Sequence, residues 1–180
     1  MKLKVFVSYS SKDKQIVEQL AASPMPNAEF FYWSKSEEPG KQAWAQITEW
    51  ITHCDLFIVV ITGHSVQRGL AVGKEVGVAR NQAKKILPLV CTRVPDDEIT
   101  FLEGIPYEAI DLLNPDQAVQ RVMEVIAKLY EKRRLEREAL LAQQQQIQIR
   151  KDSQVQLEHF RIAVALVVVV LGIILLTRKS

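Results

Sequence analysis

The sequence predicts an α/β fold in which a five-stranded parallel sheet carries helices on both of its faces. Short apolar runs alternate with amphipathic stretches over residues 3–130, as is typical of repeated strand–helix units. Residues 56–62 are rich in β-branched side chains and show no polar alternation, as expected for a central strand that is covered on both faces. Together these observations indicate a flavodoxin-like three-layer architecture.

Five apolar runs are expected to form the strands: residues 3–8, 28–33, 56–62, 85–90 and 107–112. Helices are expected between and after them: residues 12–22, 42–53, 70–83 and the chain from about residue 115. The side chains predicted to face the sheet are Ile16, Val17 and Leu20 in the first helix, Trp44, Ile47 and Ile51 in the second, and Val72, Val76, Ala79 and Ala83 in the third. Residues 35–41 contain acidic residues, a proline and a glycine, and are predicted to form a loop.

Charge is distributed unevenly along the chain. Residues 1–130 carry 14 Lys and Arg against 16 Asp and Glu, whereas residues 131–180 carry 9 against 5. The first part lacks the basic surface that nucleic-acid binding requires, so no nucleic acid is expected as a partner. The basic excess lies beside an apolar tail, where the anionic headgroups of a membrane would attract it.

The two cysteines are expected to be buried and reduced. Cys54 lies just before one predicted strand and Cys91 just after the next, so they fall at opposite ends of a parallel sheet. The length of a strand would separate them by roughly 15–20 Å, well beyond the reach of a disulfide.

Residues 131–160 are predicted to form a helical stalk, and a frayed linker is the alternative interpretation. Half of the positions in the heptad series are polar, which does not support a strong coiled coil. Lys132 and Glu136, like Arg134 and Glu138, have the spacing that supports an exposed helix. Self-association of the stalk is compatible with this pattern.

The tail has the composition of a transmembrane helix. Residues 162–177 carry no charge and are apolar on every side, with Arg161 before them and Arg178 and Lys179 after them. These residues would span roughly 24 Å as a helix, and snorkelling arginines with local thinning cover the difference from a hydrocarbon core of ~30 Å. A soluble helix of this kind would need a second domain to enclose it, so we expect residues 161–178 to anchor the chain in a lipid bilayer. No export signal precedes the folded part, which is therefore expected on the cytoplasmic side.

Topology identifies the edge of the sheet where a ligand is expected. In open parallel sheets, ligands bind beyond the carboxyl ends of the strands, where the strand order reverses. The segments that reach this edge are residues 9–12, 33–40 and 62–69. Glycine-rich phosphate loops, a nucleophile elbow and metal-ligand spacings are missing from the sequence, so no metal and no bound cofactor are expected. A phosphorelay receiver shares this topology, but the acidic residues that it requires at these strand ends are replaced.

Glu75 occupies a boundary position on the helix predicted over residues 70–83. It lies about 60° from the centre of the apolar stripe, whereas Lys74 points away from it. We therefore expect a partly sheltered carboxylate. By itself, such a residue is more often a surface group or a partner in a helical ion pair.

Several segments follow the order and spacing of motifs in a known family. Residues 5–13 form an apolar strand followed by Ser-Tyr and a short polar loop. Residues 40–62 contain a helix and a strand of matching pattern, and further matches are Ser65, Lys74, Glu75, Val76, Ala79 and residues 85–89. Over residues 3–130, the chain thereby resembles the TIR (Toll/interleukin-1 receptor) family, and bacterial TIR proteins in particular.

The resemblance implies an enzyme that cleaves the nicotinamide–ribose bond of NAD, with NAD as substrate rather than cofactor. It gives Glu75 the role of the catalytic glutamate, because a carboxylate beside the ribose stabilises the positive charge that develops as the bond breaks. It further implies that Tyr9, Ser10 and Ser11 line the nucleotide, under a loop formed by residues 33–40.

Two further residues have alternative roles. Trp33 either stacks on the substrate or packs at the end of its strand. Ser65 either helps to place the ribose or caps its helix.

One position departs from the family pattern and leaves two functions open. Enzymatic members usually carry a tryptophan four residues before the glutamate, and this chain has Ala71 there. The first function is a membrane-tethered NAD hydrolase or cyclase that is activated when TIR domains cluster, and Glu75 favours it. The second is a non-enzymatic module that relays signals through homotypic TIR–TIR contacts, and Ala71 favours it. For a microbial protein, the resemblance implies a role in signalling or innate immune defence against phage or other stress.

Overall fold

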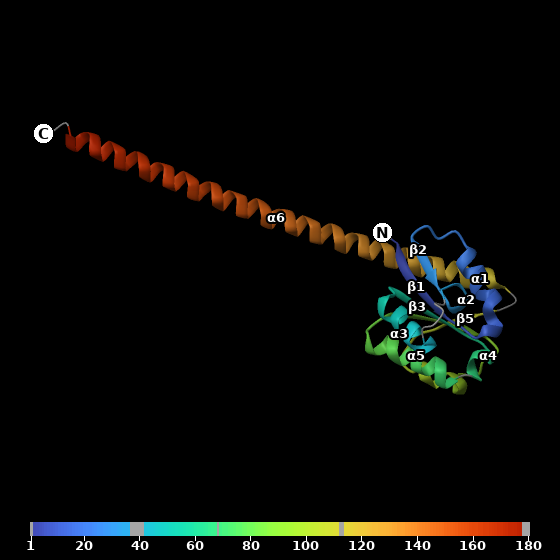
Figure 1. Ribbon diagram of the computed structural model, residues 1–180. Helices are drawn as coiled ribbons and strands as arrows, with labels where there is room; N and C mark the ends of the chain where they lie inside the picture. The colour runs from blue at the N-terminus through green and yellow to red at the C-terminus, as the bar shows by residue number, and fades with distance from the viewer. Residues whose placement is uncertain (1, 37–41, 68, 112–113, 178–180) are drawn as a thin grey trace. The chain divides into compact units, whose positions relative to one another are not determined.

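The chain forms two compact units, residues 1–130 and residues 131–180. The computed structural model describes residues 2–36, 42–67, 69–111 and 114–177, with their side chains except for those of residues 35, 36, 115 and 165–177. The first unit is an α/β domain, and the second is helical (Figure 1).

A five-stranded parallel sheet forms the centre of the first unit, which confirms the predicted fold class (Figure 1). Its strands are β1 (Leu3–Ser8), β2 (Ala28–Phe31), β3 (Leu56–Ile61), β4 (Lys85–Cys91) and β5 (Glu108–Ile110). Their order across the sheet is β2-β1-β3-β4-β5. Because β2 and β3 lie on opposite sides of β1, the order reverses there, and a ligand crevice is expected at the carboxyl ends of β1 and β3.

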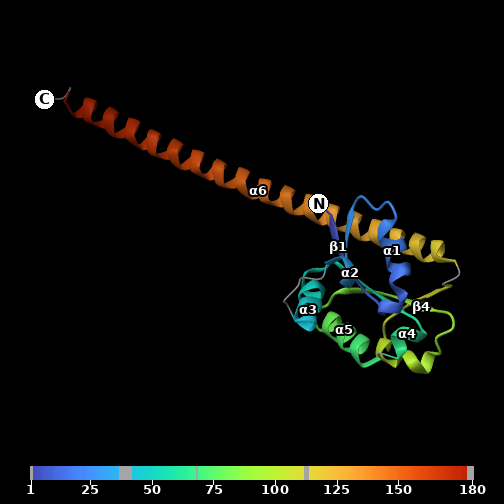
Figure 2. The ribbon, with the colours of Figure 1, turned by 45° about the vertical axis from the view of Figure 1, so that its right-hand side comes forward.

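Helices cover both faces of this sheet (Figure 2). The helical elements are η1 (Ser11–Asp13), α1 (Lys14–Ala22), α2 (Trp33–Ser36), α3 (Ala43–His53), α4 (Gly63–Val66), α5 (Gly69–Asn81), η2 (Asp96–Leu102) and α6 (Pro115–Thr177). On one face, α1 and the first turns of α6 enclose an apolar core through residues such as Val17 and Val122. On the other face, α3, α5 and η2 enclose a second core through residues such as Ile51 and Val76. Every residue of β3 is buried, which accounts for its continuous apolar sequence.

The second strand is shorter than predicted. It ends at Phe31, and the predicted strand end at Trp33 instead begins the one-turn helix α2. The rest of the predicted loop, residues 37–41, lies outside the described residues.

The inward face of α3 also differs from the prediction. Ile47 and Ile51 pack on the second core, but Trp44 in the first turn is 44% exposed, so its predicted inward position was wrong. Gln46 is buried and Trp50 packs on the core instead. These four inward residues follow the spacing of a helix face, and the polar residue within it disguised the direction of that face.

Both cysteines are buried and free of disulfide bonds. The Cys54 thiol donates a hydrogen bond to the carbonyl oxygen of Ile51 at 3.2 Å. Burial raises the pKa of this thiol to about 11, so it stays protonated at neutral pH.

The second unit consists of α6 beyond Tyr130. The expected pairs Lys132–Glu136 and Arg134–Glu138 are both present, with N–O distances of 3.8 Å. No helix in the described part of the chain has a stretch long and apolar enough to cross a membrane. The anchor is expected over residues 161–178, and the structure does not describe the side chains of residues 165–178. The anchor therefore stays a prediction.

Helix α5 ends at Asn81, two residues before the predicted end. Ala83 has a φ of 51°, in the left-handed region that favours glycine. The N–H of Ala83 bonds to the carbonyl oxygen of Arg80, and the N–H of Lys84 bonds to that of Ala79, each at 2.9 Å. This pattern is a Schellman turn, so Ala83 terminates the helix instead of extending its inward stripe.

Ala83→Gly is expected to stabilise the domain. Glycine avoids the cost of roughly 1–2 kcal/mol that an L-residue carries in this conformation, and its greater freedom in the unfolded chain offsets about 0.4–1 kcal/mol of the gain. The free energy of unfolding, measured by urea denaturation of the full chain, should rise by about 0.5–1 kcal/mol. Ala45→Gly, at an exposed position inside α3, is the matched control and should lower it by about 1 kcal/mol. A loss of stability in both variants would contradict the assigned turn.

Candidate active site at the carboxyl end of β1

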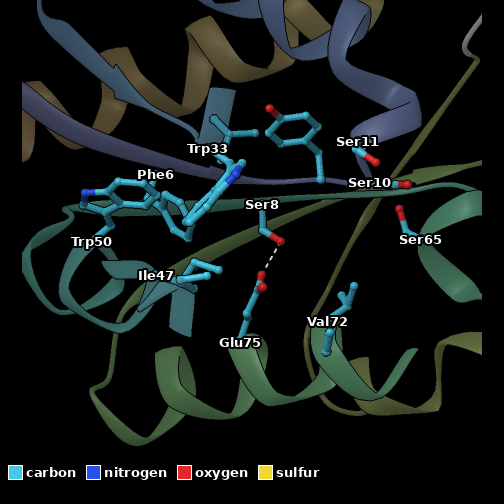
Figure 3. A pocket seen from close by; sticks show the side chains of 14 residues that line it. Phe6, Ser8, Ser10, Ser11, Trp33, Ile47, Trp50, Ser65, Val72 and Glu75 are labelled. Carbon is cyan, nitrogen blue, oxygen red and sulfur yellow. Dashed lines mark hydrogen bonds between the residues drawn. The ribbon is translucent and has the colours of Figure 1, made fainter. Parts of the chain in front are cut away.

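A cavity of about 360 Å³ lies at the carboxyl end of β1 (Figure 3). It is bordered by the end of β1 and the turn after it, the start of α2, and residues of α3, α4 and α5. The volume is near the lower end of the range of roughly 300–1,000 Å³ that is usual for small-molecule sites. The structure brings together all six residues that the sequence singled out: Tyr9, Ser10, Ser11, Trp33, Ser65 and Glu75.

Glu75 lies on the second turn of α5 and points toward the end of β1 (Figure 3). It is 9% exposed, so it is more deeply buried than its boundary position on the helix predicted. The hydroxyl of Ser8 donates a hydrogen bond to Glu75 Oε2. Ser8 is the last residue of β1 and is also buried, and it was not among the residues predicted for the site. Because a buried carboxylate is costly unless it is hydrogen-bonded, Ser8 helps α5 to tolerate Glu75 at this position.

Aromatic rings form one end of the cavity (Figure 3). Phe57 and Phe6 stack in the core with their ring centroids 5.6 Å apart, and Trp50 lies 5.6 Å from Phe6. Trp33 meets Trp50 at 5.8 Å with an interplanar angle of 64°. These four residues, the aromatic chain, run from the interior of the sheet to the cavity wall. Sequence reasoning missed Trp50, and its position three residues after the inward Ile47 was the available signal.

Hydroxyl groups lie toward the other end of the cavity (Figure 3). Ser10 is buried and Ser11 is exposed, so this end communicates with solvent.

The hydroxyl of Tyr9 donates to Ser34 Oγ at 3.0 Å and accepts the N–H of the same residue at 3.3 Å. These two bonds join the turn after β1 to α2, and so connect Tyr9 with the element that begins at Trp33.

A buried hydrogen-bond network ties the turn after β1 to the turn after β3. Thr62 Oγ1 donates to Asp13 Oδ2 at 2.7 Å. As the N-cap of α4, the same oxygen accepts the N–H groups of His64 and Ser65 at 3.1 and 3.3 Å. Ser65 Oγ donates to the carbonyl oxygen of Val60 at 2.9 Å. Ser65 therefore belongs to a capping box, which is one of the two roles considered for it.

The chemistry that this cavity offers comes from a carboxylate, hydroxyl groups and aromatic faces. Within the described ranges, no group of His, Cys, Asp and Glu is placed to hold a metal ion. The arrangement suits a ligand that has both a flat ring and hydroxyl groups, because apolar walls with a few polar groups fix the orientation of such a ligand.

The sheet order and the position of the cavity define a three-layer α/β domain with its candidate site at the switch point of the sheet. The family model described as TIR domain matches residues 5–126, which is most of the chain. The protein belongs to the TIR domain family.

Solved structures share this fold. The TIR domain of the Toll-related receptor TRR-2 from Hydra magnipapillata is 18% identical over 68% of this chain and 97% of that chain, with a TM-score of 0.52. A prokaryotic SEFIR domain is 18% identical over 69% of this chain and 92% of that chain, with a TM-score of 0.54. At this level of identity the likeness shows the fold alone. The search of curated proteins found no match.

Thr62→Val is expected to destabilise the domain because it removes a hydroxyl that serves both Asp13 and the start of α4. The carboxylate of Asp13 is buried, and a buried acceptor without its donor costs about 1–3 kcal/mol, in addition to about 1 kcal/mol for the lost cap. Urea denaturation should show a loss of about 2–4 kcal/mol in the free energy of unfolding.

Two variants control this measurement. Thr62→Ser keeps the hydroxyl and should retain most of the stability. Thr48→Val, which removes a hydroxyl bonded to the Trp44 carbonyl oxygen within α3, should change stability by less than about 0.5 kcal/mol. Equal losses in Thr62→Val and Thr62→Ser would show that the hydroxyl has no such role.

Proposed function

We propose that this protein is a membrane-anchored TIR-domain enzyme that cleaves the nicotinamide–ribose bond of NAD, as a hydrolase or a cyclase. The observation that carries the proposal is Glu75, a buried carboxylate that is held by Ser8 at a cavity of ligand size. Tyr9, Ser10 and Ser11 border the same cavity and are proposed to contact the nucleotide. Trp33 contributes its indole to the aromatic end of the cavity.

A carboxylate is the group that this reaction requires. When the bond between C1′ and the ring nitrogen breaks, its electron pair leaves with nicotinamide, and positive charge develops on the ribose. Glu75 is proposed to accept hydrogen bonds from the ribose hydroxyls and to stabilise this charge. In the hydrolase, a water oxygen then bonds to C1′ and releases one proton, which gives ADP-ribose. In the cyclase, a nitrogen of the adenine attacks C1′ in place of water.

A second candidate function is a non-catalytic module that gathers partners through TIR–TIR contacts. Ala71 borders the cavity at the position where enzymatic members usually carry a tryptophan, and its small side chain favours this alternative. Leu70, at the start of α5, is 87% exposed and offers an apolar contact to a second domain. Homotypic association is compatible with both functions, whereas a requirement for Glu75 belongs to the enzyme alone.

We also propose that residues 161–178 anchor the protein in a lipid bilayer, with the TIR domain on the cytoplasmic side. The uncharged, apolar sequence of residues 162–177 between basic flanks supports the anchor. Confinement to a membrane raises the local concentration of attached domains. Such confinement suits a signalling or defence protein that is activated by clustering.

Glu75→Gln is expected to slow nicotinamide release strongly. The amide keeps the shape of the side chain but removes the negative charge, and loss of one preorganised electrostatic contact lowers kcat by roughly 100- to 1,000-fold. The full chain should be reconstituted in vesicles at low and at high surface density, with NAD added and nicotinamide measured by chromatography. Glu18→Gln, which alters an exposed glutamate paired with Lys14 on α1, is the matched control and should keep full activity.

The outcomes separate the two candidate functions. If the wild type releases nicotinamide and Glu75→Gln releases it equally well, the proposed role of the carboxylate is excluded. If no nicotinamide appears at either density while the domains self-associate, the scaffold is favoured.

Substitution of arginine into the proposed anchor is expected to release the protein from membranes. Val168→Arg combined with Leu171→Arg adds a cost of roughly 2.5–3.5 kcal/mol per residue to insertion. The wild type should remain in the pellet after an alkaline carbonate wash, and the double variant should move to the supernatant. Leu157→Arg, at an exposed position of α6, is the control and should stay in the pellet. Release of the wild type by the wash would disprove the anchor.

A further inference from the structure

The cavity has two chemically different ends, with the carboxylate between them. In Figure 3, Trp33, Trp50 and Ile47 lie to one side of the Ser8–Glu75 hydrogen bond, and the serine hydroxyls lie to the other side. An elongated ligand that fills the cavity therefore meets aromatic rings, a carboxylate and hydroxyl groups in that order.

The aromatic end is built as a fixed wall. Phe57 and Phe6 are buried in the core, and Trp50 bridges them to Trp33. Because each ring packs against the next, the indole of Trp33 is held before any ligand arrives. Stacking of a nucleic-acid base on such a ring strengthens binding by roughly 5- to 150-fold, which corresponds to about 1–3 kcal/mol.

Hydration sets the orientation of a nucleotide in this cavity. A phosphate loses hydration among the rings near Trp33, whereas Ser10 and Ser11 offer it hydroxyl donors. The end with Ser10 and Ser11 is left for the phosphate, and the exposure of Ser11 lets the remainder of a longer ligand continue into solvent. A volume of about 360 Å³ suits one base–ribose unit better than a whole dinucleotide.

We propose that the cavity takes the nicotinamide–ribose half of a nucleotide with the base on Trp33, and that Trp50 is the positioning residue that holds this indole. The choice of nicotinamide as the base rests on the proposed function. In this orientation, the aromatic side chains at the base come from α2 and α3, and not from the turn of α5 that carries Ala71. The ribose then lies beside Glu75.

Isothermal titration calorimetry of the full chain in mild detergent tests this proposal. Nicotinamide mononucleotide should bind more tightly than adenosine monophosphate, and at least about tenfold more tightly than ribose 5-phosphate, which lacks a base. Trp33→Leu should weaken binding of the nicotinamide nucleotide at least about tenfold and leave that of ribose 5-phosphate unchanged. Trp33→Phe keeps a ring and should stay within about threefold of the wild type.

Three further variants separate positioning from folding. Trp50→Leu should weaken the nicotinamide nucleotide about threefold or more without changing ribose 5-phosphate, a selectivity that general loss of structure does not produce. Trp44→Leu, the exposed tryptophan on the same helix, should bind both ligands as the wild type does. Ala71→Trp should bind the nicotinamide nucleotide equally or more weakly, because its added ring lies away from the base.

Three results would overturn the proposal: tighter binding by Ala71→Trp, a change of less than about twofold in Trp33→Leu, or preference for adenosine monophosphate. These outcomes are distinguishable from failure of the proposed function. If nicotinamide is never released from NAD but the ligand pattern holds, the enzyme assignment fails and the binding mode stands. If nicotinamide is released and Trp33→Leu alters neither binding nor the KM for NAD, the binding mode fails and the enzyme assignment stands.

Discussion

The hydrogen bond from Ser8 to Glu75 is the contact on which the candidate site depends. It joins the end of β1 to the second turn of α5, across a separation of 67 residues in the chain. A carboxylate inside a protein loses much of its hydration, and a hydroxyl donor at the end of a strand offsets part of that loss. The contact requires β1 to lie beside β3, because the helices that follow β3 then pass over the carboxyl end of β1.

Two apolar cores hold these polar groups in position. The cores occupy opposite faces of the sheet, and the pairs Ser8–Glu75 and Asp13–Thr62 lie at its carboxyl edge. Each pair links β1 or the turn after it to a segment that follows β3, so the edge is fastened twice. A side chain whose supporting contacts are already made needs little rearrangement when a ligand arrives. The ordered aromatic chain applies the same principle to Trp33.

Local sequence patterns were sufficient for the sheet and for the edge where the cavity lies, because strand and helix periodicities depend on near neighbours. These local patterns do not reveal contacts between segments that are far apart in the sequence. The partner of Ser8 is on another element, and the meeting of Trp50 with Phe6 depends on how α3 is rotated on the sheet. Gln46 is polar but buried, so the inward face of α3 was predicted on the side of Trp44, which is exposed. The depth of Glu75 was underestimated because a helical angle contains no information about Ser8 at the end of β1, which bonds to the carboxylate, or about α3, which packs against α5.

The outline of the sheet has a consequence for crowded copies of this domain. Both outer strands are short, with four residues in β2 and three in β5, and β5 pairs with residues 89–91 of β4. The preceding part of β4 contains Lys85, which is charged, and Pro88, which has no backbone donor. Short margins, lysine and proline are the features that keep sheets from extending one another. Molecules gathered at high density are thus protected from amyloid-like polymerisation, and ordered assemblies among them must be built through helices and loops.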